Sequence, residues 1–145
     1  MKWIAELTVS LTVVALGILQ RLYHLTWQSI EHDEIFTLMV SKKPLDEMMR
    51  YVVADFVHPP GHFFLVHCCL GLPGSGVYQS RLLSVIFGAL SVVVLYWFGK
   101  YVFDWAVGIL ASAFLAVSQL ASMESQEVRP YSQLLFLVLC SGFCL

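Results

Sequence analysis

The sequence predicts an all-α integral membrane protein with about four transmembrane helices and one short interfacial helix. Hydrophobic residues make up 59% of the 145 residues, charged residues make up 12%, and the mean hydropathy is +0.77. Soluble domains contain about 25% charged residues. Several charge-free runs are also long enough to cross the hydrocarbon core of a bilayer. The formal net charge of −2 gives no indication of nucleic-acid binding.

The first predicted span covers residues 5–23, where the run from Leu7 to Gln20 carries no charge. A secretory signal peptide is the competing interpretation, because Lys2 gives the chain a basic start. No small-x-small cleavage site follows the apolar run, however. We therefore expect an uncleaved transmembrane helix.

Three further spans are predicted from the second half of the chain. Charge-free runs lie between Arg81 and Lys100 and between Asp104 and Glu124, and each is long enough to cross the bilayer. A last apolar run extends from Tyr131 without a polar cap, which predicts that the chain is the N-terminal fragment of a longer protein. The whole chain is expected to form one module, with spans at about 81–99, 105–123 and 131–145.

The loop at 24–80 contains a further apolar segment, at about 62–72, that is too short to span the membrane. As a helix, its roughly 11 residues would cover about 16 Å of a hydrocarbon core near 30 Å. Pro59-Pro60 precedes it and Pro73-Gly74 follows it. We therefore expect a short interfacial helix in the first outer loop. With the N-terminus inside, 24–80 and 124–131 then share the outer face.

Three polar segments border the apolar runs, at positions where ionisable groups are costly and tend to mark a site. Each has a simpler structural explanation. An acidic pair is common in loops, a His-Pro-Pro sequence makes a rigid turn, and a glutamate near an arginine makes an ordinary interfacial ion pair. An arginine at the start of a membrane helix can also extend toward lipid phosphates. The candidate residues are Asp33, Glu34, His58, Arg81, Glu127, Arg129 and Tyr131.

The order of these segments resembles the N-terminal module of the GT-C membrane glycosyltransferases. The chain has a helix, then Asp33-Glu34, then His58-Pro59-Pro60 before a short helix. It continues with Arg-Leu-Leu-Ser-Val-Ile-Phe-Gly-Ala-Leu from Arg81 and Ser-Gln-Glu-x-Arg-Pro-Tyr ending at Tyr131. The resemblance is greatest to the Rgt-like group, which is related to the protein O-mannosyltransferases and the lipid A aminoarabinose transferases. Gly61 departs from the pattern, because a leucine usually follows the two prolines.

The resemblance implies a hexosyl or pentosyl transferase that moves a sugar from a polyprenyl-phosphate carrier to a glycan, lipid or protein acceptor. It implies that Asp33 is the catalytic base, with Glu34 its partner. His58, Arg81, Glu127, Arg129 and Tyr131 would then bind the substrate. The implied location is the bacterial plasma membrane, with the active site on the outer face.

Simple chemistry agrees with these roles, because sugar transfer needs a base for the acceptor hydroxyl and cations for the departing phosphate. Glu127 is an alternative base, with Asp33 then structural.

No nucleotide-binding or zinc-ligand spacing appears in the sequence. No cofactor is expected with certainty, and a divalent metal is a possibility that no motif supports. A transporter fragment and a truncated, non-catalytic membrane protein are the alternative functions, and the fragment alone is expected to be inactive.

Overall fold

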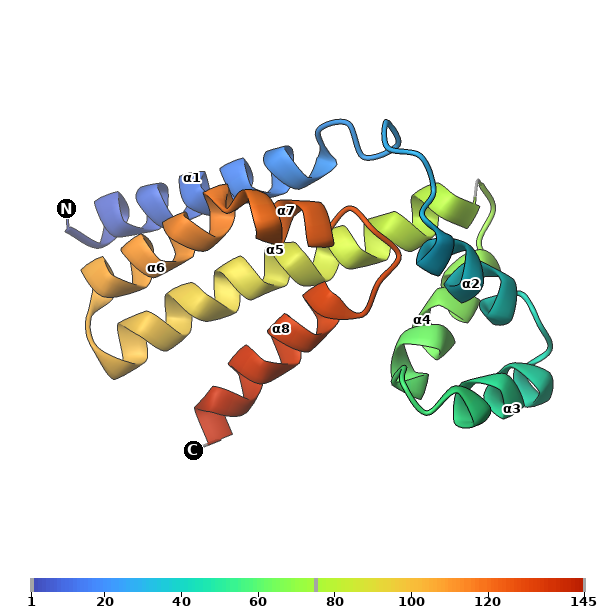
Figure 1. Cartoon of the computed structure of the whole chain (residues 1–145). Helices are drawn as coiled ribbons and strands as arrows, with labels where there is room; N and C mark the ends of the chain where they lie inside the picture. Colours follow the sequence, from blue (N-terminus) through green and yellow to red (C-terminus); the bar gives the residue numbers. More distant parts are fainter. Residues whose placement is uncertain (1, 75, 145) are drawn as a thin grey trace.

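The computed structural model describes residues 2–74 and 76–144, which form helices joined by short connections. Four helices run alongside one another as a bundle (Figure 1). They are α1 (Lys2–Leu22), α5 (Gly76–Val102), α6 (Trp105–Val117) and α8 (Tyr131–Ser141). α5 is the central element and packs against the other three. This arrangement confirms the predicted all-α membrane fold.

Two of these helices have the length and apolar composition needed to cross a membrane. They are Trp3–Leu22 within α1 and Gly76–Val102, which is α5. α6 and α8 are shorter apolar helices of 13 and 11 residues. α5 begins at Gly76, before the predicted boundary at 81.

Small residues allow α5 and α6 to approach closely at the turn that joins them. A Cβ atom added to Gly99 would lie 2.8 Å from the Cα of Gly108, a distance that real Cβ contacts do not reach. The Asp104 side chain caps α6 by accepting a hydrogen bond from the Val107 backbone at 2.8 Å. A side chain at Gly99 or Gly108 would therefore force the two helices apart in the α5–α6 hairpin.

The run predicted as one helix over 105–123 is divided into α6 and the short α7 (Gln119–Glu124). Ser118 has an extended ψ of 116°, and its hydroxyl caps α7 by accepting from the Ala121 backbone at 3.3 Å. The freed carbonyls at the end of α6 accept hydrogen bonds from the Arg21 guanidinium instead. Hydropathy alone does not reveal this break, since both sides of it are apolar.

The predicted loop at 24–80 contains three short helices rather than one. They are α2 (His32–Ser41), α3 (Leu45–Asp55) and α4 (Pro60–Leu70), which we call the cap helices. A capping box between Glu31 and Glu34 starts α2, and prolines precede α3 and α4. Their shared core is a buried cluster of Val40, Met48, Val52 and Phe63.

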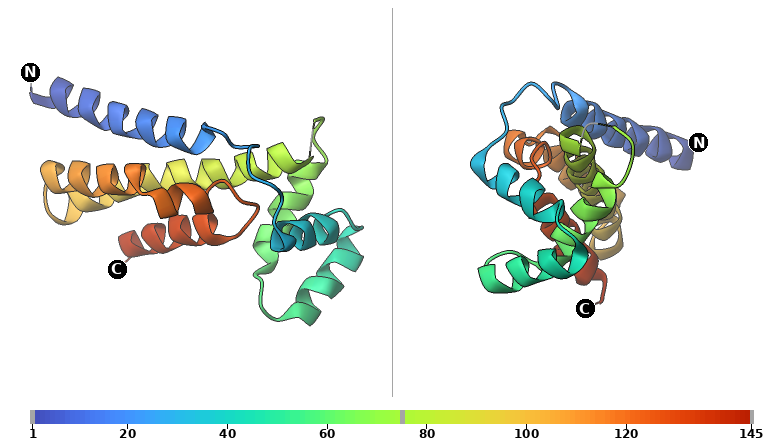
Figure 2. Two further views of the ribbon diagram at one scale, coloured as in Figure 1. Left: turned by 45° about the horizontal axis from the view of Figure 1, so that its top comes forward. Right: turned by 90° about the vertical axis from the view of Figure 1, so that its right-hand side faces the viewer.

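The cap helices gather at one end of the bundle, which we call the cap end (Figure 2). The C-terminal end of α1 and the N-terminal ends of α5 and α8 lie at this end (Figure 1). The connection at 125–130 between α7 and α8 also lies at this end, where the Val128 backbone donates to Glu34 of α2. Segments that are far apart in the sequence therefore meet at the cap end.

Candidate functional site

A buried ion pair joins the first cap helix to the start of α5. Glu34 is fully buried, and Arg81 is 1% exposed. Two nitrogens of Arg81 donate to the two carboxylate oxygens of Glu34, at 3.0 and 2.7 Å. The remaining guanidinium contacts are with backbone carbonyls, at 2.9 Å from Leu25 and 3.2 Å from Gln28. These contacts occupy Arg81 and tie the 25–29 connection to α5.

Glu34 also links α2 to the connection before α8. Its carboxylate accepts hydrogen bonds from the backbone of Val128 at 2.8 Å and of Glu31 at 3.2 Å. Burial acts to raise the pKa of Glu34, but the hydrogen bonds from Arg81 and the two backbone groups outweigh it and lower the pKa. The carboxylate is therefore ionised at neutral pH, and it fixes three segments of the cap end.

Asp33 lies next to Glu34 in the sequence but faces a different environment. Its side chain is 62% exposed and forms an ion pair with Arg129, which is 15% exposed. The hydrogen bond from Arg129 lowers the pKa of Asp33, and the opposite charge acts in the same direction. Arg129 also donates to the Tyr131 hydroxyl at 2.8 Å, and its guanidinium lies 5.1 Å from the centre of that ring. An acid and a cation are thus paired at the surface of the cap end.

His58 lies in the connection between α3 and α4. Its Nδ1 is 2.5 Å from the Asp55 carboxylate, so Asp55 sets the orientation of the ring. Pro59 and Pro60 then start α4 at the point where a missing backbone N–H is tolerated. The motif therefore fixes both the imidazole and the direction of the helix that follows.

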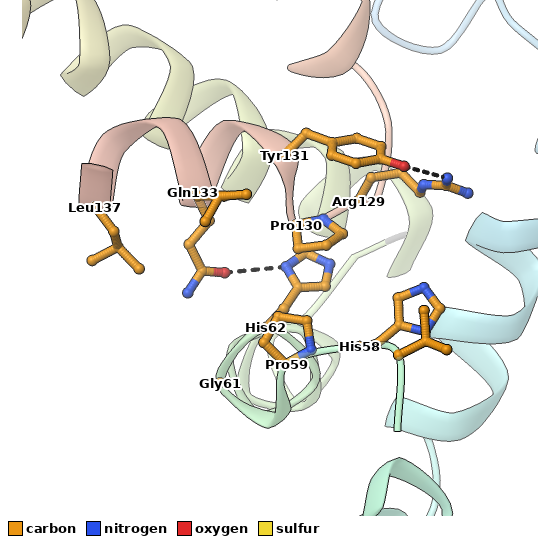
Figure 3. A pocket seen from close by; sticks show the side chains of 11 residues that line it. His58, Pro59, Gly61, His62, Arg129, Pro130, Tyr131, Gln133 and Leu137 are labelled. Carbon is orange, nitrogen blue, oxygen red and sulfur yellow. Dashed lines mark hydrogen bonds between the residues drawn. The ribbon is translucent and has the colours of Figure 1, made fainter. Parts of the chain in front are cut away.

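A cavity of about 390 Å³ lies where this motif meets the start of α8 (Figure 3). Arg129 and His58 line it beside Tyr131, and Leu134 and Leu137 of α8 form an apolar wall. The remaining lining residues are Val57, Pro59, Gly61, His62, Pro130 and Gln133. The cavity thus combines cationic and aromatic groups with an apolar surface that follows α8 into the bundle.

Two residues that the sequence did not single out position the turn carrying Arg129. Arg21 is fully buried and donates to the carbonyls of Leu115 and Ala116 and to the Ser125 hydroxyl. In return, the Gln126 amide donates to three carbonyls at the end of α1, the shortest contact being 2.8 Å. Gln126 therefore caps the C-terminal end of α1, and Arg21 caps the C-terminal end of α6. Neither has a motif that would have revealed this role.

Glu127 lies in the same turn but does not line the cavity. Burial raises its pKa, and the nearby carboxylates of Glu31, Glu124 and Glu34 raise it further. The structure therefore brings His58, Arg129 and Tyr131 to the cavity and pairs Asp33 with Arg129. Glu34 and Arg81 form a buried pair that does not line the cavity, and Glu127 does not line it either. In residues 2–74 and 76–144, no group of three or more His, Cys, Asp or Glu side chains is arranged to hold a metal ion.

Comparison with known proteins identifies the family. The sequence model for dolichyl-phosphate-mannose-protein mannosyltransferases matches residues 57–145, which include His58, Arg81, Arg129 and Tyr131 but not Asp33. No curated protein and no solved structure matches the chain. The matched segment covers more than half of the sequence and agrees with the resemblance to GT-C enzymes. The chain therefore belongs to the dolichyl-phosphate-mannose-protein mannosyltransferase family of membrane glycosyltransferases.

Proposed function

We propose that this chain carries the donor-binding end of an enzyme that transfers a sugar from a polyprenyl-phosphate carrier to an acceptor hydroxyl. The cavity at the cap end is the observation that carries the proposal. It combines a guanidinium, an imidazole and an apolar wall, and a lipid-linked sugar phosphate has the matching parts. The acceptor would be a glycan, a lipid or a protein.

Arg129 is suited to hold the donor phosphate. Its planar guanidinium can donate two parallel hydrogen bonds to phosphate oxygens, and it lines the cavity with only 15% of its side chain exposed. Leu134 and Leu137 continue the cavity wall along α8, where an isoprenoid chain would lie in contact with apolar side chains. His58, oriented by Asp55, supplies a second polar group at the same end.

Asp33 is suited to accept the proton of the attacking hydroxyl. While it is paired with Arg129 its pKa is lowered, which makes it a weak base. A donor phosphate would compete for the same guanidinium. Loss of that partner would raise the pKa of Asp33 toward its usual value and strengthen it as a base. In this mechanism, donor binding activates the base.

Glu34 and Arg81 are proposed as positioning residues rather than as groups that touch the substrate. Every polar contact of their side chains is with each other or with the backbone. Arg81 is therefore not free to take a phosphate. The pair instead holds α2 against the turn before α8, and so places Asp33 next to Arg129.

Glu127 remains the alternative base, and its raised pKa is the observation in its favour. It is half-buried among other carboxylates and does not line the cavity.

We further infer that the cap end faces the outside of a bacterial plasma membrane. The support is the predicted topology, in which the N-terminus lies inside. Residues 24–80 then follow one crossing and residues 124–131 follow three crossings, so both segments would lie outside.

Substituting Arg129 with lysine tests the proposed phosphate site. Arg129→Lys keeps the charge but removes the planar pair of donors, so the KM for the lipid-phosphate donor should rise by about tenfold or more. The measurement is sugar transfer by the intact protein in proteoliposomes at several donor concentrations. Arg50→Lys is the matched control, because Arg50 is an exposed arginine of α3 outside the cavity. A donor KM that is the same in both variants would contradict the assignment.

A further inference from the structure

Two polar side chains in the cavity wall have no role in the proposal so far. His62, on α4, is 2% exposed, and its Nδ1 lies 3.2 Å from the side-chain oxygen of Gln133 on α8. The other ring nitrogen, Nε2, is buried and has no hydrogen-bond partner among the residues that the structure describes. Figure 3 shows the two side chains joined across the cavity wall beneath Pro130.

An unpaired buried nitrogen is unusual, because leaving such an atom without a partner is energetically costly. Burial lowers the pKa of His62, although Gln133 and the backbone of Val128 act in the opposite direction, so the ring is neutral at neutral pH. Although the Val128 backbone influences the ring in this way, Nε2 has no hydrogen-bond partner among the residues that the structure describes. If Nδ1–H donates to the Gln133 oxygen, the lone pair of Nε2 is left as an acceptor.

Gln133 offers the complementary group. With its oxygen paired to His62, its amide NH₂ remains as a donor. Gly61 faces this amide, and a Cβ atom added there would lie 4.0 Å from the amide nitrogen. Because Gly61 has no side chain, the amide stays open to the cavity. His62 and Gln133 both line the cavity, and together they carry a buried, unpaired acceptor and a free donor.

We propose that His62 and Gln133 bind a hydroxyl group of the transferred sugar, beside the phosphate held by Arg129. A hydroxyl can donate to Nε2 and accept from the amide at the same time. An ionised phosphate has no proton to donate, and its oxygens would face the lone pair of Nε2. This inference rests on the proposed function and identifies the part of the donor that lies against α4.

A comparison of two ligands tests the inference. Binding of polyprenyl phosphate, with and without an attached sugar, would be measured on the intact protein in nanodiscs. Mannosyl, glucosyl and arabinosyl donors form the sugar panel, and the donor that binds most tightly is used. His62→Phe and Gln133→Leu should each weaken binding of the sugar-bearing donor by about tenfold. Their affinity for the bare carrier phosphate should stay within about twofold of the unmodified protein.

His67→Phe is the matched control for these variants. His67 lies on the same helix, and its Nδ1 is 2.7 Å from the Ser41 carbonyl, but it does not line the cavity. It should change neither affinity. Gly61→Leu, which places a side chain over the Gln133 amide, should weaken only the sugar-bearing donor. If His62→Phe fails to fold, Gly61→Leu still tests whether His62 and Gln133 bind the sugar.

The outcomes separate this inference from the proposed function. Variants that weaken both ligands equally, or neither, would overturn the role of His62 and Gln133 while leaving the phosphate site intact. An unmodified protein that binds neither ligand would overturn the proposed function, and the hydroxyl site with it.

Discussion

Asp33→Asn should slow sugar transfer by about 10²–10⁴-fold, the usual contribution of a general base. The asparagine oxygen can still accept the hydrogen bond from Arg129, but it cannot take a proton at neutral pH. Because the Asp33 side chain is 62% exposed, the protein should fold and insert normally. The measurement is the single-turnover transfer rate in proteoliposomes with saturating donor. Asp46→Asn, in the first turn of α3, is the matched control and should leave the rate unchanged.

Glu127→Gln, measured in parallel, distinguishes the two candidate bases. If Asp33→Asn retains full activity while Glu127→Gln does not, the base is Glu127 and the assignment of Asp33 is wrong. If Asp33 is the base, the transfer rate should also depend on pH in a specific way. Arg129 lowers the pKa of Asp33 in the free protein, and bound phosphate should raise it. The acid limb of kcat should therefore lie at a higher pH than that of kcat/KM.

Arg81→Met should destabilise the protein by about 3–5 kcal/mol, the usual effect of removing one partner from a buried ion pair. The substitution leaves the Glu34 carboxylate fully buried without its cation. Reversible unfolding in detergent would measure the loss. The double variant Glu34→Gln, Arg81→Met should be less destabilised than the sum of the single variants, because it buries no unpaired charge.

Two further measurements check this account of the pair. Lys43→Met removes a partly exposed ion pair with Glu47 and should leave unfolding nearly unchanged. The contribution of Glu34 also depends on pH, because its pKa is lowered in the folded protein. That contribution is present above the pKa of the unfolded chain and is lost as the pH falls through the folded pKa. Additive single variants, or equal effects of Arg81→Met and Lys43→Met, would contradict a buried, coupled pair.

The fold class could be predicted because a helix needs a long charge-free run to cross the hydrocarbon core of a membrane. Counting the crossings also placed the segments of Asp33 and Arg129 on one side, and the structure joins these two residues in an ion pair. The cap helices were harder to predict. Four charged residues are interspersed among the apolar residues of α3, whose Met48 and Val52 are buried, so no charge-free run marks this helix in the sequence.

The environment of each charged residue could not be predicted from its neighbours in the sequence. Asp33 and Glu34 are adjacent, yet one is exposed and the other is fully buried. Helical geometry points adjacent residues in different directions, and tertiary packing decides which of them is covered. The role of Arg21 could not be predicted for the same reason, since its partners Leu115 and Ala116 are more than 90 positions away in the chain. The polar pair of His62 and Gln133 likewise forms only when α4 meets α8.

The central claim is that the cavity between the His58 motif and α8 binds the lipid-phosphate donor from the outer side. Photocrosslinking tests it most directly. A short-chain, water-soluble isoprenyl-phosphate sugar with a photoreactive group in the isoprenyl chain would be added outside right-side-out vesicles containing the intact protein. Mass spectrometry would then identify the labelled residues, with excess unlabelled donor as competitor. The account predicts competed labelling at 57–62 and 129–137. Competed labelling elsewhere, or labelling only when the probe is admitted to the vesicle interior, would contradict it.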